Sequence, residues 1–110
     1  MPTSGSVVTE VGIRQAWLFL TFCDNEPTPP KETRLYLDTN WALGTTHFDL
    51  DADELESGLL TLCQVLNRTL NGASRSGADL VLDLGDADQL RIDGRGAANT
   101  TRDVWWLGKA

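Results

Sequence analysis

The chain reads AWLFLTF at residues 16–22 and returns to a closely similar pattern, ADLVLDL, at residues 78–84. Both stretches are rich in residues that suit a pleated, half-buried surface, which indicates β-strands. Two further matches follow in the same order along the chain: LYLD at residues 35–38 with LRID at residues 90–93, and WALG at residues 41–44 with WWLG at residues 105–108.

Self-similarity on this scale is typical of one supersecondary unit used twice. The unit reads as strand, turn, strand, loop, strand, so we expect two similar antiparallel β-meander halves, at about residues 11–44 and 69–108. Together they should contain about six strands. Residues 11–23 are expected as the first strand and residues 34–39 as the second.

Strand alternation predicts which side chains form the core. In the first hairpin the leucines and phenylalanine of residues 18–22 share a face with the leucines of residues 35–37. In the second hairpin the same alternation selects one more set. The expected core is Leu18, Leu20, Phe22, Leu35, Leu37, Leu80, Leu82, Leu84, Leu90 and Ile92.

A helix is expected between the two halves, because the apolar period changes there from two to about 3.6. Asp51 is the expected N-cap, and Glu54 three residues later completes a capping box. The helix should run over residues 51–66 and pack on one face of a sheet. Its apolar face consists of Leu55, Leu59, Leu62, Cys63 and Leu66.

These elements predict an α+β fold with antiparallel sheets. A chain of 110 residues can bury roughly two thirds of its unfolded surface, which is enough for one core. We therefore expect a flexible N-terminal leader at residues 1–10, rich in Ser, Gly and Thr, and a single domain at residues 11–110.

The charge of the chain restricts its partners. Its net charge is −7 with nine Lys and Arg residues, which argues against nucleic acid, since phosphates are bound by cationic patches. A basic protein partner fits this charge better, and a homodimer is the other partnership that we expect. The longest apolar run, residues 16–23, is too short to cross a bilayer, and residues 1–10 lack the features of a signal peptide. We expect a cytoplasmic protein with no membrane partner.

Candidate catalytic groups are few. His47 is the only histidine, and the two cysteines, Cys23 and Cys63, are spaced for neither a metal pair nor a small disulfide framework. The carboxylates around the second hairpin could hold a divalent cation or act as acid and base, but their solvent-facing and turn positions explain them without a metal. We therefore expect no catalytic residue, no cofactor and no metal. The weak metal candidates are Asp83, Asp86, Asp88 and Asp93.

An aromatic set lies on the register opposite the expected core. The first hairpin carries Trp17, Phe19 and Tyr36 there, whereas the second carries mainly charged residues. Neighbouring residues of a strand point to opposite faces, so one of the last two tryptophans joins this set; Trp105 is taken as that residue. Either the helix covers these rings or a partner does, and partners commonly bind through Trp and Tyr. The predicted partner-binding residues are Trp17, Phe19, Tyr36 and Trp105.

The second half has a Leu-rich strand, an acidic turn, the strand Leu90-x-Ile92 and the ending Asp103-x-Trp105. With these features it resembles small β-rich bacterial domains of unknown function, frequent in high-GC Gram-positive bacteria, several of which look like immunity or partner-binding proteins. The chain departs from them at the turn, where Gly85 to Gln89 replaces an Asp-Gly pair. The resemblance implies a fold and assigns no role to any residue.

Three functions remain open from the sequence. The first is a non-enzymatic protein-binding module of the immunity or regulatory type, in keeping with a small acidic chain poor in catalytic side chains. The second is a metal-dependent hydrolase or small-ligand protein that uses the acidic hairpin. The third is a structural subunit of a homo-oligomer.

Overall fold

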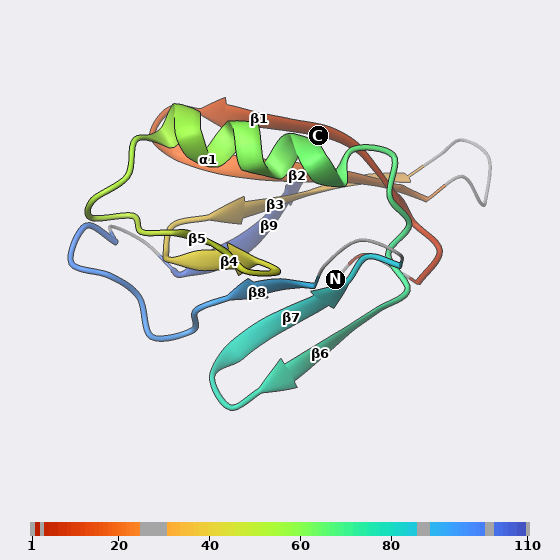
Figure 1. Cartoon of the computed structure of the whole chain (residues 1–110). Helices are drawn as coiled ribbons and strands as arrows, with labels where there is room; N and C mark the ends of the chain where they lie inside the picture. Colours follow the sequence, from red (N-terminus) through yellow and green to blue (C-terminus); the bar gives the residue numbers. More distant parts are fainter. Residues whose placement is uncertain (1, 3, 25–30, 86–88, 101–102, 110) are drawn as a thin grey trace.

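The computed structural model describes residues 2, 4–24, 31–85, 89–100 and 103–109 of the chain. Within them the protein is mostly β, with two antiparallel sheets and one short α-helix (Figure 1). An α+β class accommodates this arrangement. The described residues contain nine strands, so the expectation of about six is not confirmed.

The first sheet has the strand order β1-β2-β3-β9. What the sequence suggested as one strand over residues 11–23 is a hairpin, in which Arg14 pairs with Trp17 and leaves a two-residue turn. Gln15 adopts a φ of 56° in that turn, the left-handed conformation that tight hairpins favour. The strands are β1 (Val7–Arg14), β2 (Trp17–Asp24), β3 (Lys31–Leu37) and β9 (Trp105–Lys109).

Residues 7–10 belong to β1 and not to the expected leader. Val8 is fully buried and pairs with Phe22 of β2, while the backbone of residues 5–8 is hydrogen-bonded to residues 67–70. Only Val7 and Val8 are apolar in this stretch, which is too few to show a period in the sequence. Long-range pairing, rather than local composition, makes it a strand.

The second sheet has the strand order β5-β4-β8-β7-β6. Its edge strands differ in character: β6 has the sequence GASRS, with four of its five residues exposed, whereas β5 ends at the buried Phe48. The strands are β4 (Trp41–Leu43), β5 (Thr46–Phe48), β6 (Gly72–Ser76), β7 (Asp79–Asp83) and β8 (Leu90–Ile92).

The expected meander halves do not form separate sheets. After the β2–β3 hairpin the chain crosses over, and β4 pairs with β8 of the second sheet; after the β7–β8 hairpin it crosses back, and β9 pairs with β3 of the first. Asp38 and Thr39, at the first crossing, are buried. Each sheet is thus completed by a strand from the other part of the chain, which joins both sheets to one core.

The expected core residues are all buried and all belong to one hydrophobic cluster, which leaves out Phe19, Tyr36 and Val81 of the opposite register and so confirms the alternation in both hairpins. Leu20, Leu35 and Leu82 have no exposed surface, and β2 pairs with β3 in the register that puts Leu18 opposite Leu37. Trp41 and Phe48 add a stacked pair of rings, with centroids 5.1 Å apart. The two sheets share this single hydrophobic cluster.

The helix α1 (Leu55–Leu62) is shorter than expected and continues as a 3₁₀ turn, η1 (Cys63–Val65). Its N-cap is Glu54, which makes no side-chain capping bond, so the prediction of Asp51 as N-cap is wrong. The Asp51 carboxylate instead accepts hydrogen bonds from the backbone N–H groups of Ala98, at 3.0 Å, and Asn99, at 2.7 Å. No helix in the described ranges is long and apolar enough to cross a bilayer.

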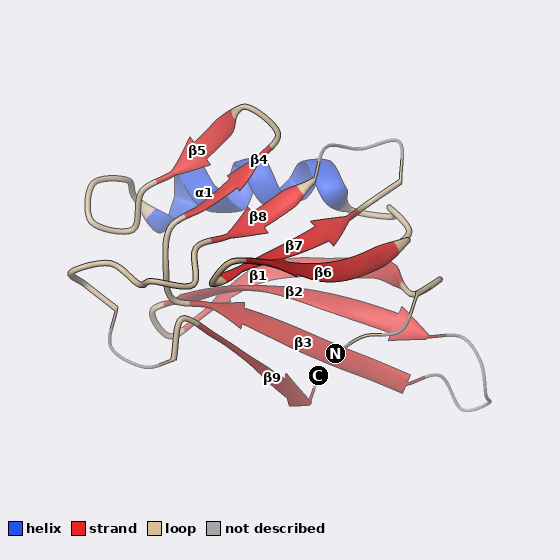
Figure 2. Cartoon of the chain, turned by 90° about the horizontal axis from the view of Figure 1, so that it is seen from below, coloured by secondary structure: helices blue, strands red, loops and turns tan. Residues whose placement is uncertain are grey.

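The helix packs against the core side of the first sheet. Gly58 lies so close to its neighbours that a Cβ there would be 2.7 Å from Phe48 of β5 and 2.8 Å from Leu18 of β2. In Figure 1 the helix runs beside β1 and β2, and in Figure 2 it is on the side of the molecule away from β9. The helix therefore packs between the two sheets on the core side. It does not cover the opposite face of the first sheet.

Candidate functional site

The face of the first sheet that is turned away from the core, called the outer face here, carries a row of aromatic side chains. Strand register aligns Gly12 of β1 with Phe19, Phe19 with Tyr36, and Tyr36 with Trp106 of β9. Trp17 precedes Phe19 by two residues and shares its face. Trp17, Phe19, Tyr36 and Trp106 form the aromatic row.

The rings of the aromatic row contact one another in sequence. Tyr36 stacks on Trp106, with centroids 5.3 Å apart and planes 11° from parallel. Trp17 meets the same tryptophan edge to face, at 5.2 Å and 85°. Phe19 lies 5.7 Å from Tyr36 on the other side. Both geometries are favourable for aromatic pairs, so each ring is held by its neighbours.

Two glycines let the rings lie low on the sheet. A Cβ on Gly12 would be 2.6 Å from Cζ of Phe19, and a Cβ on Gly108 would be 3.0 Å from Cε2 of Tyr36. Both phenyl rings therefore occupy the space that a side chain on the adjacent strand would fill. This explains why Phe19 and Tyr36 are buried although they point away from the core.

An ion pair completes the cover over Phe19. The Arg34 guanidinium lies 4.3 Å above the Phe19 ring centroid and donates from Nη2 to Oε1 of Glu10 at 3.1 Å. The same carboxylate oxygen accepts a hydrogen bond from the buried Thr21 hydroxyl at 3.1 Å. Arg34, Glu10 and Thr21 thus form a polar border on one side of the aromatic row.

The structure changes one member of the predicted site. Trp105 pairs with Leu37 and packs against the core, where the Arg75 guanidinium lies 5.1 Å from its ring centroid. Trp106, next along the strand, takes the place on the outer face. The sequence showed that one of the two would do so, but only the β3–β9 register shows which one. The prediction of Trp105 as a member of the row is therefore wrong.

The helix does not cover the aromatic row, since it packs on the opposite face against Leu18. Phe19 and Tyr36 are buried by their neighbours, whereas Trp17 and Trp106 keep part of their surface exposed. The accessible part of the row is therefore the edge-to-face tryptophan pair.

The acidic hairpin offers no joint metal site in the described part of the chain. Asp83 is the last residue of β7, and its Oδ1 accepts from the N–H of Gly85 at 3.2 Å. Asp93 lies at the other end of the hairpin, close to Asp79, which is four residues or about 13 Å of strand from Asp83. Asp86 and Asp88 lie outside the described residues. The described ranges contain no group of three or more His, Cys, Asp or Glu residues placed to bind a metal.

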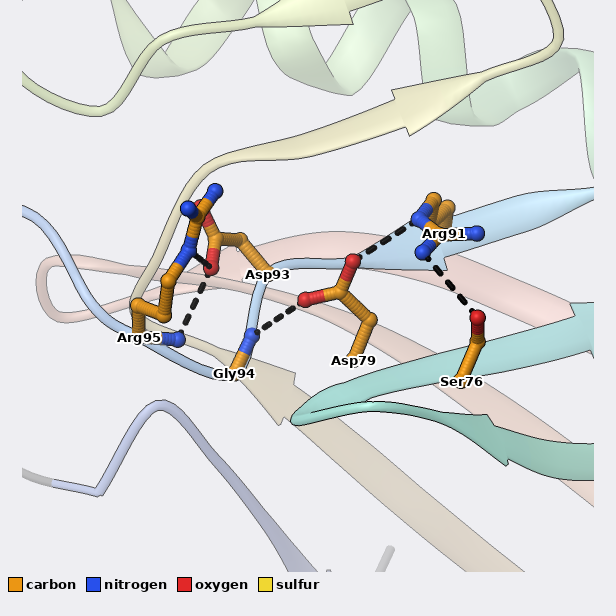
Figure 3. A network of polar contacts seen from close by, with 6 residues as sticks. All are labelled: Ser76, Asp79, Arg91, Asp93, Gly94 and Arg95. Atoms are coloured by element: carbon orange, nitrogen blue, oxygen red, sulfur yellow. Dashed lines mark hydrogen bonds and ion pairs between the residues drawn. The ribbon is translucent and has the colours of Figure 1, made fainter.

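A shallow pocket of about 350 Å³ lies on the second sheet, and no sequence pattern indicated it. Figure 3 shows the ion pairs along it: Nε of Arg91 donates to Oδ2 of Asp79 at 2.8 Å, and Arg95 pairs with Asp93 at 3.2 Å. His47 lies in β5 and contributes to the wall. The pocket is lined by Asn40, Trp41, Ala42, His47, Phe48, Asp49, Asp79, Arg91, Asp93 and Arg95.

Hydrogen bonds favour the ionised form of two of these carboxylates and lower their pKa. The Gly94 N–H donates to Asp79 at 3.1 Å and, with Arg91, lowers the pKa of that carboxyl below its ordinary value. Hydrogen bonds from Arg95 lower the pKa of Asp93 in the same way. Each acid in this network therefore has a cationic partner, which describes a bracing network between β7 and the turn after β8 better than a proton-transfer site.

The cysteines do not take part in either site. Cys23 is buried in β2, Cys63 is exposed in η1, and they form no disulfide within the part of the chain that the structure describes.

Comparison with protein-family models, with curated proteins and with solved structures found no match. The functional argument therefore depends on the geometry of the chain itself.

Proposed function

We propose that the protein is a non-enzymatic protein-binding module, of the immunity or regulatory type, that binds its partner through the outer face of the first sheet. The observation that carries this proposal is the pair formed by Trp17 and Trp106. Their rings meet at 5.2 Å, partly exposed, on a sheet face opposite the helix. Large aromatic residues at the centre of an interface supply much of the binding energy.

The arrangement of the row favours binding because it is already ordered. Tyr36 stacks under Trp106 and Gly108 gives Tyr36 room, so the tryptophan loses little side-chain freedom when a partner packs against it. The Arg34–Glu10 pair beside the row supplies a polar rim, in the manner of known interfaces.

The partner that fits this chain is a basic protein with an apolar centre to its binding surface. The net charge of −7 attracts a cationic partner and raises its rate of association, while the tryptophan pair supplies the buried contact. The charge therefore selects the partner, and the rings hold it.

The test is affinity capture from the cytoplasm of the source cells with three forms of the protein in parallel. Wild type and the control variant Leu60→Ser should both retain the same basic protein, because Leu60 is 73% exposed on the helix, away from the aromatic row. Trp17→Ser should lose it. Titration of the purified partner against each form then gives the dissociation constants, and we expect a loss of at least about tenfold for Trp17→Ser.

Two results would remove the proposal. One is equal affinity of the captured protein for all three forms, which would place its binding site elsewhere. The other is the capture of chaperones alone. The melting temperature of Trp17→Ser serves as the check on folding, since a partly exposed tryptophan should be replaceable without loss of the folded state.

A second function, binding of a small ligand, has the second-sheet pocket in its favour. The ion pairs of Asp79 and Asp93 with arginines already compensate most of the charge in it. Asp83 and Asp93, the two hydrolase candidates among the described residues, lie at opposite ends of the hairpin and share no site. Calorimetry with calcium, magnesium and manganese tests whether the acidic residues bind a metal ion. Heat of binding that is lost in Asp93→Asn would favour the metal-dependent or small-ligand function over the protein-binding one.

A further inference from the structure

The strand β9 is an apolar edge strand. Within the described residues it pairs only with β3, and Figure 2 shows it at the outer margin of the first sheet. Leu107 in its middle is 38% exposed, one of two large hydrophobic side chains exposed to this extent among the described residues. The edge strand β6 of the other sheet has the polar sequence GASRS instead. Natural proteins protect edges with charges and polar residues, and the middle of β9 carries neither.

The direction of the backbone groups of β9 follows from one hydrogen bond. The carbonyl of Val104 accepts from the N–H of Asp38 at 3.0 Å, so residue 104 faces β3. Antiparallel strands alternate, so residues 106 and 108 also face β3, whereas residues 105 and 107 direct their N–H and C=O groups to the open edge. A strand added at this edge would bond to Trp105 and Leu107.

We propose that the occupant of this edge is a second copy of the chain, with β9 of each copy antiparallel to the other about a twofold axis at Trp106. This inference does not rest on the proposed function. In this register Leu107 lies opposite Trp105 of the second copy on the same sheet face. Because both residues present their backbone groups to the edge, they form the hydrogen-bonded pairs that an antiparallel ladder requires.

Charge supports this register over its neighbours. Asp103, two residues before the start of β9, and Lys109, at its end, each lie three residues from Trp106, so a ladder extended to residue 103 aligns each acid of one copy with the lysine position of the other. A twofold interface must be complementary to itself, and opposite charges at equal distances from the axis meet that requirement. An axis at Trp105 would instead put Asp103 opposite Leu107, and an axis at Leu107 would put Lys109 opposite Trp105. With the axis at Trp106, the two copies share one continuous eight-stranded sheet, and Trp106 of one copy lies beside Trp106 of the other.

The first test is the solution mass by light scattering and sedimentation equilibrium at about 0.15 M salt, which screens the repulsion between two chains of net charge −7. Wild type should have about twice the chain mass of 12.1 kDa. Leu107→Pro should be monomeric, because it removes an N–H that faces the edge and not β3, a position where strands tolerate proline. Leu107→Thr keeps that N–H and should still dimerise. A wild-type mass of 12.1 kDa at high concentration, or a dimeric Leu107→Pro, would overturn the proposal.

The second test examines the register and does not depend on a proline being tolerated. Asp103→Lys and Lys109→Asp each align like charges twice, so each variant alone should dimerise at least about fivefold more weakly than wild type. Mixed in equal amounts they should recover the dimer, since every aligned pair is then opposite in sign. If either variant dimerises as tightly as wild type, or if the mixture gains nothing, the register is wrong. Trp17→Ser, which disrupts the proposed partner site, should leave the dimer intact.

Discussion

Replacement of Leu82 with alanine tests the core and the register of the second sheet. Leu82 lies in β7, paired with Ala73 of β6 and Leu90 of β8, and has no exposed surface. Truncation of a buried leucine costs about 2–5 kcal/mol, because apolar contacts are lost and a cavity remains. Neighbours on both sides of a central strand limit collapse of the cavity, so we expect about 3 kcal/mol, a substantial part of a total stability of about 5–15 kcal/mol.

The matched control is Leu60→Ala, which removes the same atoms from a side chain that is 73% exposed. Its free energy of unfolding should change by less than about 0.5 kcal/mol. Urea denaturation followed by tryptophan fluorescence gives both values, and the melting temperature of Leu82→Ala should fall by about 12–20 °C. Equal losses for the two variants, or a loss below 1 kcal/mol for Leu82→Ala, would refute the assignment of Leu82 to the core.

Three further predictions concern the helix, a loop and the acid response. Gly58→Ala should lower the free energy of unfolding by about 1 kcal/mol in urea denaturation, because the new methyl group meets Phe48 and Leu18, although alanine has the better helix propensity. The control Gly72→Ala, whose methyl group meets nothing within 4 Å, should not be destabilised. Equal effects of the two changes would contradict the packing of α1. Asp51→Ala should speed amide hydrogen exchange at residues 98 and 99 without loss of helical circular dichroism, and loss of helix would restore the capping role. The pKa of Asp79 is lowered in the folded protein, so the ionised carboxylate stabilises the fold. This stabilisation is complete above the ordinary carboxyl pKa of about 3.9 and is lost as the pH falls below that value. The melting temperature should therefore fall less steeply between pH 4 and pH 2 in Asp79→Asn than in wild type.

The sequence predicted the interior of this protein well because buried positions recur as apolar residues at a regular spacing along each strand and helix. Alternation alone identified Leu18, Leu35 and Leu82 as core residues, and the helical period identified the segment that contains Leu55 and Leu62. What alternation does not contain is which strand pairs with which. The crossing of β4 to β8 and of β9 to β3 depends on contacts between residues far apart in the chain. The sequence pattern does not contain these contacts, so it predicts two separate meanders.

The candidate site was predicted in part for the same reason. Trp17, Phe19 and Tyr36 were assigned to one face by parity, but the choice between Trp105 and Trp106 required the register of β9. The pairing of Arg34 with Glu10 joins residues 24 apart on different strands, which local patterns do not reveal. Asp51 shows the opposite error: a local capping pattern was present, and a distant pair of backbone N–H groups at residues 98 and 99 took the carboxylate instead.

The measurement that tests the central claim most directly is a titration of ¹⁵N-labelled protein with the captured partner, followed at the four tryptophan indole N–H signals in NMR spectra. Each signal is assigned by a single Trp→Phe substitution. The signals of Trp17 and Trp106 should shift or broaden on binding, whereas that of Trp41, which is 3% exposed in the core, should keep its position. Binding that leaves Trp17 and Trp106 unchanged would show that the aromatic row is not the partner site.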